Sequence, residues 1–194
     1  MTDDSRVLYL LACAAPPAQH LPTGITLAQQ AGWDVCLVLS PSAYSWQTTE
    51  QLGELEELTG HPVRYTYKRP EAEDVLPAAD AMLVAPATFN SINKWAAGIS
   101  DTLLLGLVTE AIGLQLPVVA LPYLNAAQAA HPALDTSVAF LRAAGVSVLL
   151  GSGGFTPHVP KHGDTEHYPW AAAIDALPRR AQPNGIRRVT PLNS

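Results

Sequence analysis

Small hydroxyl and amide side chains gather directly behind a buried apolar run near the middle of the chain. The run Ala81 to Ala85 stops at Pro86, which cannot donate a hydrogen bond to a sheet. The polar residues that follow within one short stretch are Thr88, Asn90, Ser91 and Asn93. In open α/β sheets ligands bind at the carboxyl ends of the strands, and a helix N-terminus there favours an anion. The stretch therefore predicts a binding site for a polar ligand.

A histidine-rich stretch near the C-terminus is the other candidate for chemistry. His158, His162 and His167 could in principle ligate a metal, but Pro157 and Pro160 prevent the helix that would align the first two. No carboxylate or cysteine is placed as a fourth ligand. The sequence therefore predicts no metal site, and the stretch is interpreted as a solvated or clamp-like loop. A glycine-rich phosphate loop and a nucleophile-elbow serine are also absent from the sequence.

Three further residues, His131, Cys13 and Cys36, could take part in chemistry or have only a structural role. His131 precedes Pro132, so it could face the ligand end of the sheet or simply be a polar group at a helix start. Cys13 and Cys36 both lie in apolar, strand-like runs and are interpreted as packing residues, because free cysteine behaves as a small buried hydrophobe.

The composition limits the class of protein. The 194 residues suit one domain, and 48% hydrophobic residues can bury a sizeable core. A net charge of −6 argues against non-specific binding of nucleic acid, and the low charged fraction of 14% suggests contacts within a homo-oligomer. No secretion signal is evident and no apolar run approaches the roughly 20 residues that span a bilayer. We therefore expect a cytoplasmic protein without membrane contact.

Strand-like and helix-like patterns alternate along most of the chain. The expected strands are 7–13, 34–39, 63–67, 81–85, 117–121 and 146–150. The expected helices are 23–31, 49–59, 73–78, 101–113 and 134–144, with a last short helix over 170–177. Continuous apolar runs indicate strands buried on both faces, as in a parallel sheet. The prediction is a three-layer α/β/α fold with a six-stranded parallel sheet.

The central stretch carries a resemblance to a known family. Its residues Pro86 to Ser91, Lys94, Ala97 to Ile99 and Asp101 resemble the central signature of the homo-oligomeric flavin-containing cysteine decarboxylases. That family includes phosphopantothenoylcysteine decarboxylase and the lantibiotic peptidyl-cysteine decarboxylases. The segments 122–125, 132–133 and 32–40 are similar to further motifs of the family. The resemblance extends over about residues 6 to 150.

The resemblance implies a Rossmann-like flavoprotein that binds FMN and assembles as a trimer or dodecamer. Carried across residue by residue, the flavin contacts would be Thr88, Phe89, Asn90 and Ser91, with Ala14, Ala15 and Ser40 near the phosphate. Asp101 would begin the helix at the site, and Asn125 would meet the substrate carboxylate as the catalytic residue. The expected organisation is a flavoprotein domain over 1–150, a His/Pro/Gly-rich segment with a short helix over 151–178, and a loose basic tail over 179–194.

Several positions depart from the family pattern. Ala14 and Ala15 stand where the family has Gly-Ser, Ala72 stands where the catalytic histidine is expected, and no cysteine occurs between 151 and 163. Leu124 replaces a methionine, which is a mild change. We therefore expect a flavin-dependent redox or decarboxylation step on a small molecule or peptide, other than the usual histidine-assisted reaction. A non-catalytic, partner-binding flavin-fold protein is the main alternative, and a flavin prenyltransferase-like enzyme is a weaker one.

Overall fold

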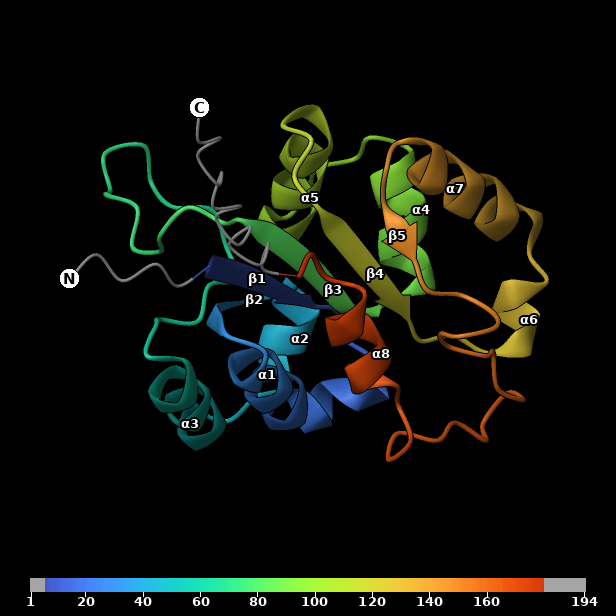
Figure 1. Cartoon of the computed structure of the whole chain (residues 1–194), viewed down its shortest axis with the longest axis horizontal. Coiled ribbons are helices and arrows are strands. Elements are labelled where there is room, and N and C mark those ends of the chain that lie inside the picture. Colours follow the sequence, from blue (N-terminus) through green and yellow to red (C-terminus); the bar gives the residue numbers. More distant parts are fainter. Residues whose placement is uncertain (1–5, 180–194) are drawn as a thin grey trace, which may run out of the picture.

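A single parallel sheet forms the centre of the molecule. The computed structural model describes residues 6–179, and Figure 1 shows the sheet between two layers of helices. Its strands are β1 Arg6–Ala12, β2 Trp33–Leu39, β3 Ala81–Ala87, β4 Val118–Pro122 and β5 Ser147–Val148. They pair in the order β2-β1-β3-β4-β5, and every pair is parallel. The three-layer α/β/α prediction is confirmed.

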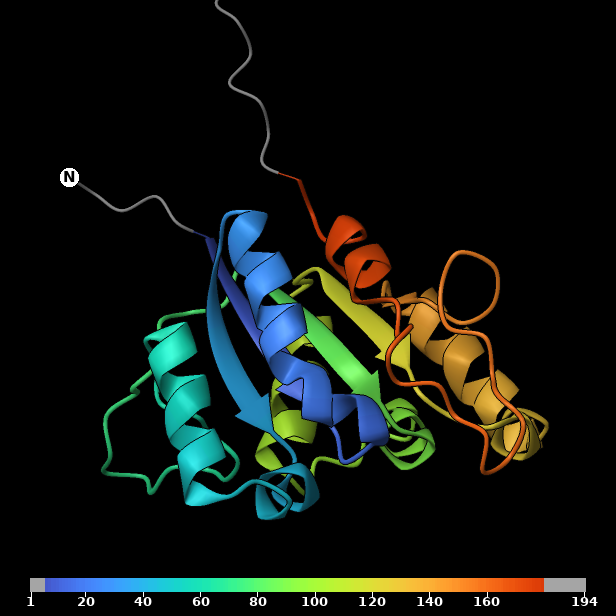
Figure 2. The same cartoon turned by 90° about the horizontal axis from the view of Figure 1, so that it is seen from below.

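Helices cover both faces of the sheet. The helices α1 Leu21–Gln30, α3 Thr49–Thr59 and α8 Trp170–Asp175 lie on one face (Figure 2). The helices α4 Phe89–Ala96, α5 Leu103–Gly113 and α7 Pro132–Ala143 lie on the other (Figure 1). Three short helices follow β1, β2 and β4 directly: the 3-10 helix η1 Pro16–His20, α2 Pro41–Ser45 and α6 Ala126–Ala129. The carboxyl edge of the sheet is therefore surrounded by helix beginnings.

Apolar side chains on both faces explain why the central strands are buried. All seven residues of β3 are buried, and so are the last five of β2. Leu10, Leu37 and Leu83 are completely enclosed in the core. Continuous rather than alternating apolar sequence is what a strand covered by helices on both sides requires.

The prediction of six strands is wrong, because the stretch 63–67 does not join the sheet as a strand. Only Arg64 pairs there, through a single bridge to Val38 at the edge of β2. The apolar residues that alternate along 63–67 are packed in other ways than by strand pairing. Val63 is buried, and the Tyr65 ring stacks on Tyr44 with 3.6 Å between ring centroids. The last strand is also shorter than predicted, since β5 has two residues.

The predicted helix over 73–78 is also wrong. This part of the chain is an irregular loop, held by a Lys68–Asp74 ion pair of 2.9 Å and by Tyr9 Oη, which donates to Pro77 O over 2.7 Å. Pro77 within the segment and the lack of an apolar face explain the absence of a helix. The helix α4, in contrast, was not predicted as a separate helix.

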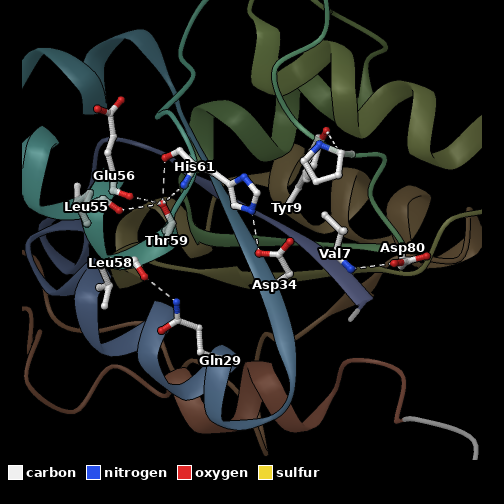
Figure 3. Close-up of polar contacts among 11 residues, drawn as sticks. Val7, Tyr9, Gln29, Asp34, Leu55, Glu56, Leu58, Thr59, His61 and Asp80 are labelled. Carbon is white, nitrogen blue, oxygen red and sulfur yellow. Dashed lines mark hydrogen bonds and ion pairs between the residues drawn. The ribbon is translucent and has the colours of Figure 1, made fainter. Parts of the chain in front are cut away.

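Polar contacts around α3 connect the β2 edge of the sheet to the neighbouring segments (Figure 3). His61 Nε2 lies 2.8 Å from Asp34 Oδ1, and Gln29 Nε2 donates to Leu58 O over 2.7 Å. Val63 N donates to Glu56 Oε1 over 2.9 Å. These contacts join α3 to β2 and α1, and they engage His61 in a structural pair.

The chain after β5 returns across the carboxyl edge of the sheet before it forms α8. We call residues 149–169 the return segment. It is joined to the start of α6 by a bridge between Asn125 and His158 and to η1 by a contact between His20 and Thr165. The expected last helix is confirmed as α8. The expected loose tail lies outside the described residues except for Arg179, and the division at residue 150 stays a prediction.

None of the helices within residues 6–179 combines the length and the apolar character needed to cross a membrane. The longest of them, α7, has twelve residues and several polar or charged side chains. A bilayer crossing requires about 20 predominantly apolar residues.

Candidate functional site

A pocket of about 590 Å³ opens at the carboxyl ends of β1, β2, β3 and β4. Its lining brings together all nine residues that the sequence proposed for the site: Ala14, Ala15, Ser40, Thr88, Phe89, Asn90, Ser91, Asp101 and Asn125. These residues span more than a hundred positions of sequence, and the sheet topology assembles them at one edge. Their roles stay predictions, but their placement agrees with the ligand position expected of open α/β sheets.

Helix caps build most of the wall. Thr88 Oγ1 accepts from Ser91 N over 3.2 Å at the start of α4, and Ser40 Oγ accepts from Ala43 N over 3.2 Å at the start of α2. Asn125 caps α6 with a reciprocal pair: its Oδ1 accepts from Gln128 N over 2.9 Å, and Gln128 Oε1 accepts from Asn125 N over 3.0 Å. Side-chain oxygens at these positions satisfy amides that a helix start leaves free. We call these three caps the cap wall.

Hydroxyl and thiol groups behind the cap wall form a short chain. Ser91 Oγ accepts from Thr88 Oγ1 over 3.0 Å and from Cys13 Sγ over 3.2 Å. Because the Ser91 hydroxyl accepts twice, its own hydrogen is left to donate to a ligand. Burial raises the pKa of the Cys13 thiol, so Cys13 stays protonated at neutral pH and acts as a donor.

Main-chain amides are available where the sequence lacks polar side chains. Within the described residues, the amides of Ala14 and Ala15 donate no hydrogen bond. They line the pocket together with Ser40, the cap of α2, and Ser42 in the first turn of α2. Free amides and hydroxyls of this kind fit a phosphate group. Alanines in place of the Gly-Ser pair of the resembled family therefore remove the serine hydroxyl, but the two main-chain amides remain as donors.

Cations contribute little to the lining. Lys94 is the one lysine or arginine among the lining residues, and it forms an ion pair with Asp101 at the pocket rim. An anion in this pocket would be bound by amides, hydroxyls and the helix N-termini, not by a free positive side chain.

The apolar part of the wall suits a planar ring. Phe89, Leu104, Leu105 and Leu124 supply it, next to the Tyr123 ring. The imidazole of His131 packs edge-on against Phe89, with 5.5 Å between ring centroids. His131 itself caps α7 and does not line the pocket. Of the two roles considered for His131, the structure therefore shows that of a polar group at a helix start.

The histidines that suggested a metal do not gather. Among residues 6–179 no three metal-binding side chains come together. His167 lies 2.7 Å from Asp164 on the exposed side of the return segment, whereas His158 lines the pocket. Ala72, where the family histidine was expected, is exposed in the loop before β3 and does not line the pocket.

Sequence reasoning missed several residues of the lining. Gln128 could have been found, because its spacing of three from Asn125 is the signature of a capping box. Tyr123 and Lys94 were noticed as parts of motifs but not as pocket residues. His158 was considered only as a metal ligand, because its place in the pocket depends on the pairing of the return segment with residue 125.

Comparison with known proteins gives the family. The profile of the family described as Flavoprotein matches residues 7–177. A curated cysteine/cysteine sulfinic acid decarboxylase from an unidentified prokaryote is 36% identical over 76 residues, which are 39% of this chain and 20% of that protein. The match thus spans about a fifth of the curated relative.

Solved structures resemble the chain over more of its length. The FMN-dependent cysteine decarboxylase SpaF is 25% identical with a TM-score of 0.62, covering 90% of this chain and 98% of that one. The peptidyl-cysteine decarboxylase EpiD is 26% identical with a TM-score of 0.60, covering 73% and 79%. With the profile match over most of its length, the chain belongs to the Flavoprotein family.

Proposed function

We propose that this protein binds FMN in the pocket and uses it for a redox or decarboxylation step on a small molecule or peptide. The observation that carries the proposal is that one pocket joins free main-chain amides, helix caps and an apolar wall. The relatives support it, since SpaF is an FMN-dependent cysteine decarboxylase and EpiD a peptidyl-cysteine decarboxylase.

The lining offers a distinct group for each part of the cofactor. The amides of Ala14 and Ala15, with Ser40, would hold the phosphate. The Asn90 side chain, which makes no hydrogen bond within residues 6–179, would meet polar edges of the ring system together with Ser91. When bound, FMN supplies an acceptor for two electrons. The apolar wall would keep water from the ring, and the helix caps would orient the donors.

Asn125 would orient the substrate from the opposite side of the pocket. Its Oδ1 is engaged in the cap of α6, so the side-chain NH₂ is the group left to donate to a carboxylate. Residue 72 is alanine, so the chain has no histidine at the position where the family carries its catalytic histidine. Losing a positioned acid or base costs about 10² to 10⁴ in rate. We therefore expect no release of carbon dioxide from phosphopantothenoylcysteine above background.

The first experiment is an absorbance spectrum of the purified protein, with the released cofactor identified by mass. Flavin bands and FMN in the supernatant are expected. The variant Asn90→Leu should lose flavin while keeping the circular dichroism of the wild type. Gln30→Leu, an exposed position on α1 away from the pocket, is the matched control and should stay yellow.

Two results would contradict the proposal. One is a folded Asn90→Leu variant with stoichiometric flavin, which would move the binding site elsewhere. The other is a colourless wild type that refuses added FMN, which would favour the partner-binding alternative. Light scattering on the same samples tests the expected homo-oligomer, a trimer or dodecamer.

A further inference from the structure

A second hollow, of about 730 Å³, lies on the face of the sheet that α1 and α3 cover (Figure 2). We call it the α1–α3 groove. It is bordered by η1 with the first turn of α1, by the residues at the end of α2, and by one side of α3. It shares no lining residue with the pocket at the carboxyl edge of the sheet. What it binds is therefore independent of the proposed function.

The floor of the α1–α3 groove is apolar and an aromatic ring stands beside it. Ala18, Leu21 and Leu55 in the lining are buried. Trp46, also in the lining, is 53% exposed, whereas the other three tryptophans of the chain are at most 5% exposed. A large aromatic side chain left in water next to an apolar hollow is typical of a surface that a partner covers.

The charge of this part of the chain is negative throughout. Residues 7–63, which include η1, α1, α2 and α3, contain five acidic residues and no lysine or arginine. Four of the five are exposed on α3: Glu50, Glu54, Glu56 and Glu57. Glu54 lines the groove and forms no ion pair with any residue in 6–179. An uncompensated negative field of this kind attracts cationic groups and rejects acidic ones.

The polar lining is suited to a main chain. Besides Glu54, three glutamines border the groove: Gln19, Gln47 and Gln51. A side-chain amide carries both donors and an acceptor, as does each residue of an extended polypeptide. In the described part of the chain the amides of Gln19 and Gln47 make no hydrogen bond. The Gln51 oxygen accepts from Thr48 N over 2.9 Å, which leaves its NH₂ to donate.

We propose that the α1–α3 groove binds an extended segment of a partner protein in which an arginine stands next to an apolar residue. The apolar side chain fills the floor, the guanidinium lies over the Trp46 ring and pairs with Glu54, and the glutamine amides bond the main chain. Arginine is favoured over lysine because its planar group stacks on an aromatic face while it pairs with a carboxylate.

The test is the binding of a fluorescein-labelled hexapeptide of alternating leucine and arginine to the full chain, followed by fluorescence anisotropy. Saturable binding that weakens with added salt is expected, since charge contributes to it. The same peptide with lysine for arginine should bind at least about threefold more weakly, because the stacking is lost. With glutamate for arginine it should not bind up to about 1 mM.

Variants of the two wall residues locate the site. Trp46→Ala and Glu54→Lys should each weaken binding of the arginine peptide at least about tenfold. Glu54→Gln, which keeps the shape of the side chain, should weaken it about threefold or more. The matched controls lie on the opposite face of the sheet. They are Phe140→Ala, at a site 54% exposed on α7, and Glu110→Lys, exposed on α5, and both should bind as the wild type does.

Several results would overturn the inference. One is a wild type that binds the glutamate peptide as well as the arginine peptide. Another is a loss of binding that is equal in the control and wall variants, with circular dichroism confirming that all are folded. Displacement of the peptide by an equal concentration of spermine would reduce the groove to a site for any polycation. The variants should keep the FMN content of the wild type, and a protein that binds the peptide but takes up no FMN contradicts the proposed function alone.

Two further measurements separate a partner protein from the other occupants. A change in the oligomer size of Trp46→Ala, seen by light scattering, would assign the groove to a second copy of the chain. Residues 180–194 contain three arginines and no acidic residue, and they lie outside the described residues. Binding of the peptide only to a chain shortened after Arg179 would assign the groove to those residues instead. The proposal expects unchanged oligomer size and equal peptide affinity, within about threefold, with and without residues 180–194.

Discussion

The cap wall and the return segment border the same pocket, but their polar side chains do different things. In the cap wall, Thr88, Ser40 and Asn125 each use a side-chain oxygen to begin a helix. In the return segment, His158 keeps its Nε2 without a partner among the described residues. The comparison teaches that the polar side chains of the cap wall are already used to begin helices, whereas the return segment brings a nitrogen without a hydrogen-bond partner to the pocket lining.

The two parts also differ in how they are anchored. The cap wall follows β3 and β4, which are buried over their full length, and β2, whose last five residues are buried, so the core of the sheet fixes it. The return segment and the helix after it are held by a few contacts, each made by an individual residue. Tyr168 Oη donates to Leu121 O over 2.6 Å, and the buried Trp170 ring packs on α1. A change at one anchor should therefore affect the return segment more than the cap wall.

The largest effect is expected from Trp170→Ala. Trp170 is 4% exposed and its ring lies so close to α1 that a Cβ on Gly24 would come within 2.6 Å of it. Removing a buried aromatic side chain costs about 3–5 kcal/mol. Urea unfolding should show this loss, and Trp46→Ala, at a site 53% exposed, should cost less than about 1 kcal/mol. Equal losses in the two variants would mean that α8 does not anchor the segment.

Asn125→Asp should separate binding from capping. A carboxylate oxygen can still cap α6, so we expect the unfolding free energy to change by less than about 0.5 kcal/mol. The donor NH₂ is lost, and a negative charge would face the carboxylate of the proposed substrate. Turnover, or affinity for a carboxylate ligand, should fall by about 10²-fold. Unchanged affinity in a stable variant would show that Asn125 is only a helix cap.

Tyr168→Phe tests the second anchor through pH. Burial raises the pKa of Tyr168 well above 10.0, so the folded state favours the protonated phenol. Its contribution is fully present below pH 10 and is lost as the pH rises toward the folded pKa. At pH 7 the variant should be less stable by about 1–3 kcal/mol. The difference from the wild type should shrink above pH 10, and a constant difference would contradict the role of the phenol.

The strands show what an apolar pattern can and cannot predict. The runs that became β1 to β4 were predicted because helices cover both faces and exclude polar residues. The stretch 63–67 shows the same alternation as an edge strand. Its tyrosines are instead stacked on Tyr44 or placed beside Gly106, and stacking leaves the same sequence pattern as pairing.

In the site, too, the sequence predicted residues that belong to a short motif but not residues that only the fold brings to the pocket. The residues near Thr88 were found because polar side chains follow a buried apolar run within one short stretch, whereas Asn125 was found through the resemblance to the decarboxylase family. The helix α4 itself was missed, since only Ile92 and Trp95 are buried in it and polar side chains fill the rest. His158 could not have been found from its neighbours in sequence, because the fold alone brings residue 158 to residue 125.

The smallest expected effect comes from Thr88→Ala, which tests whether the cap wall is fixed before a ligand binds. The alanine leaves Ser91 N without its cap and Ser91 Oγ without one donor. Loss of a cap costs about 1 kcal/mol, and Thr88→Ser, which keeps the hydroxyl, should cost only a few tenths. If the cap fixes the amides for the ligand, FMN affinity should fall by about tenfold in the alanine variant and hardly at all in the serine variant, as measured by flavin fluorescence. Equal flavin affinity in both would mean that the ligand itself organises the start of α4, and the cap wall would then be no more fixed than the return segment.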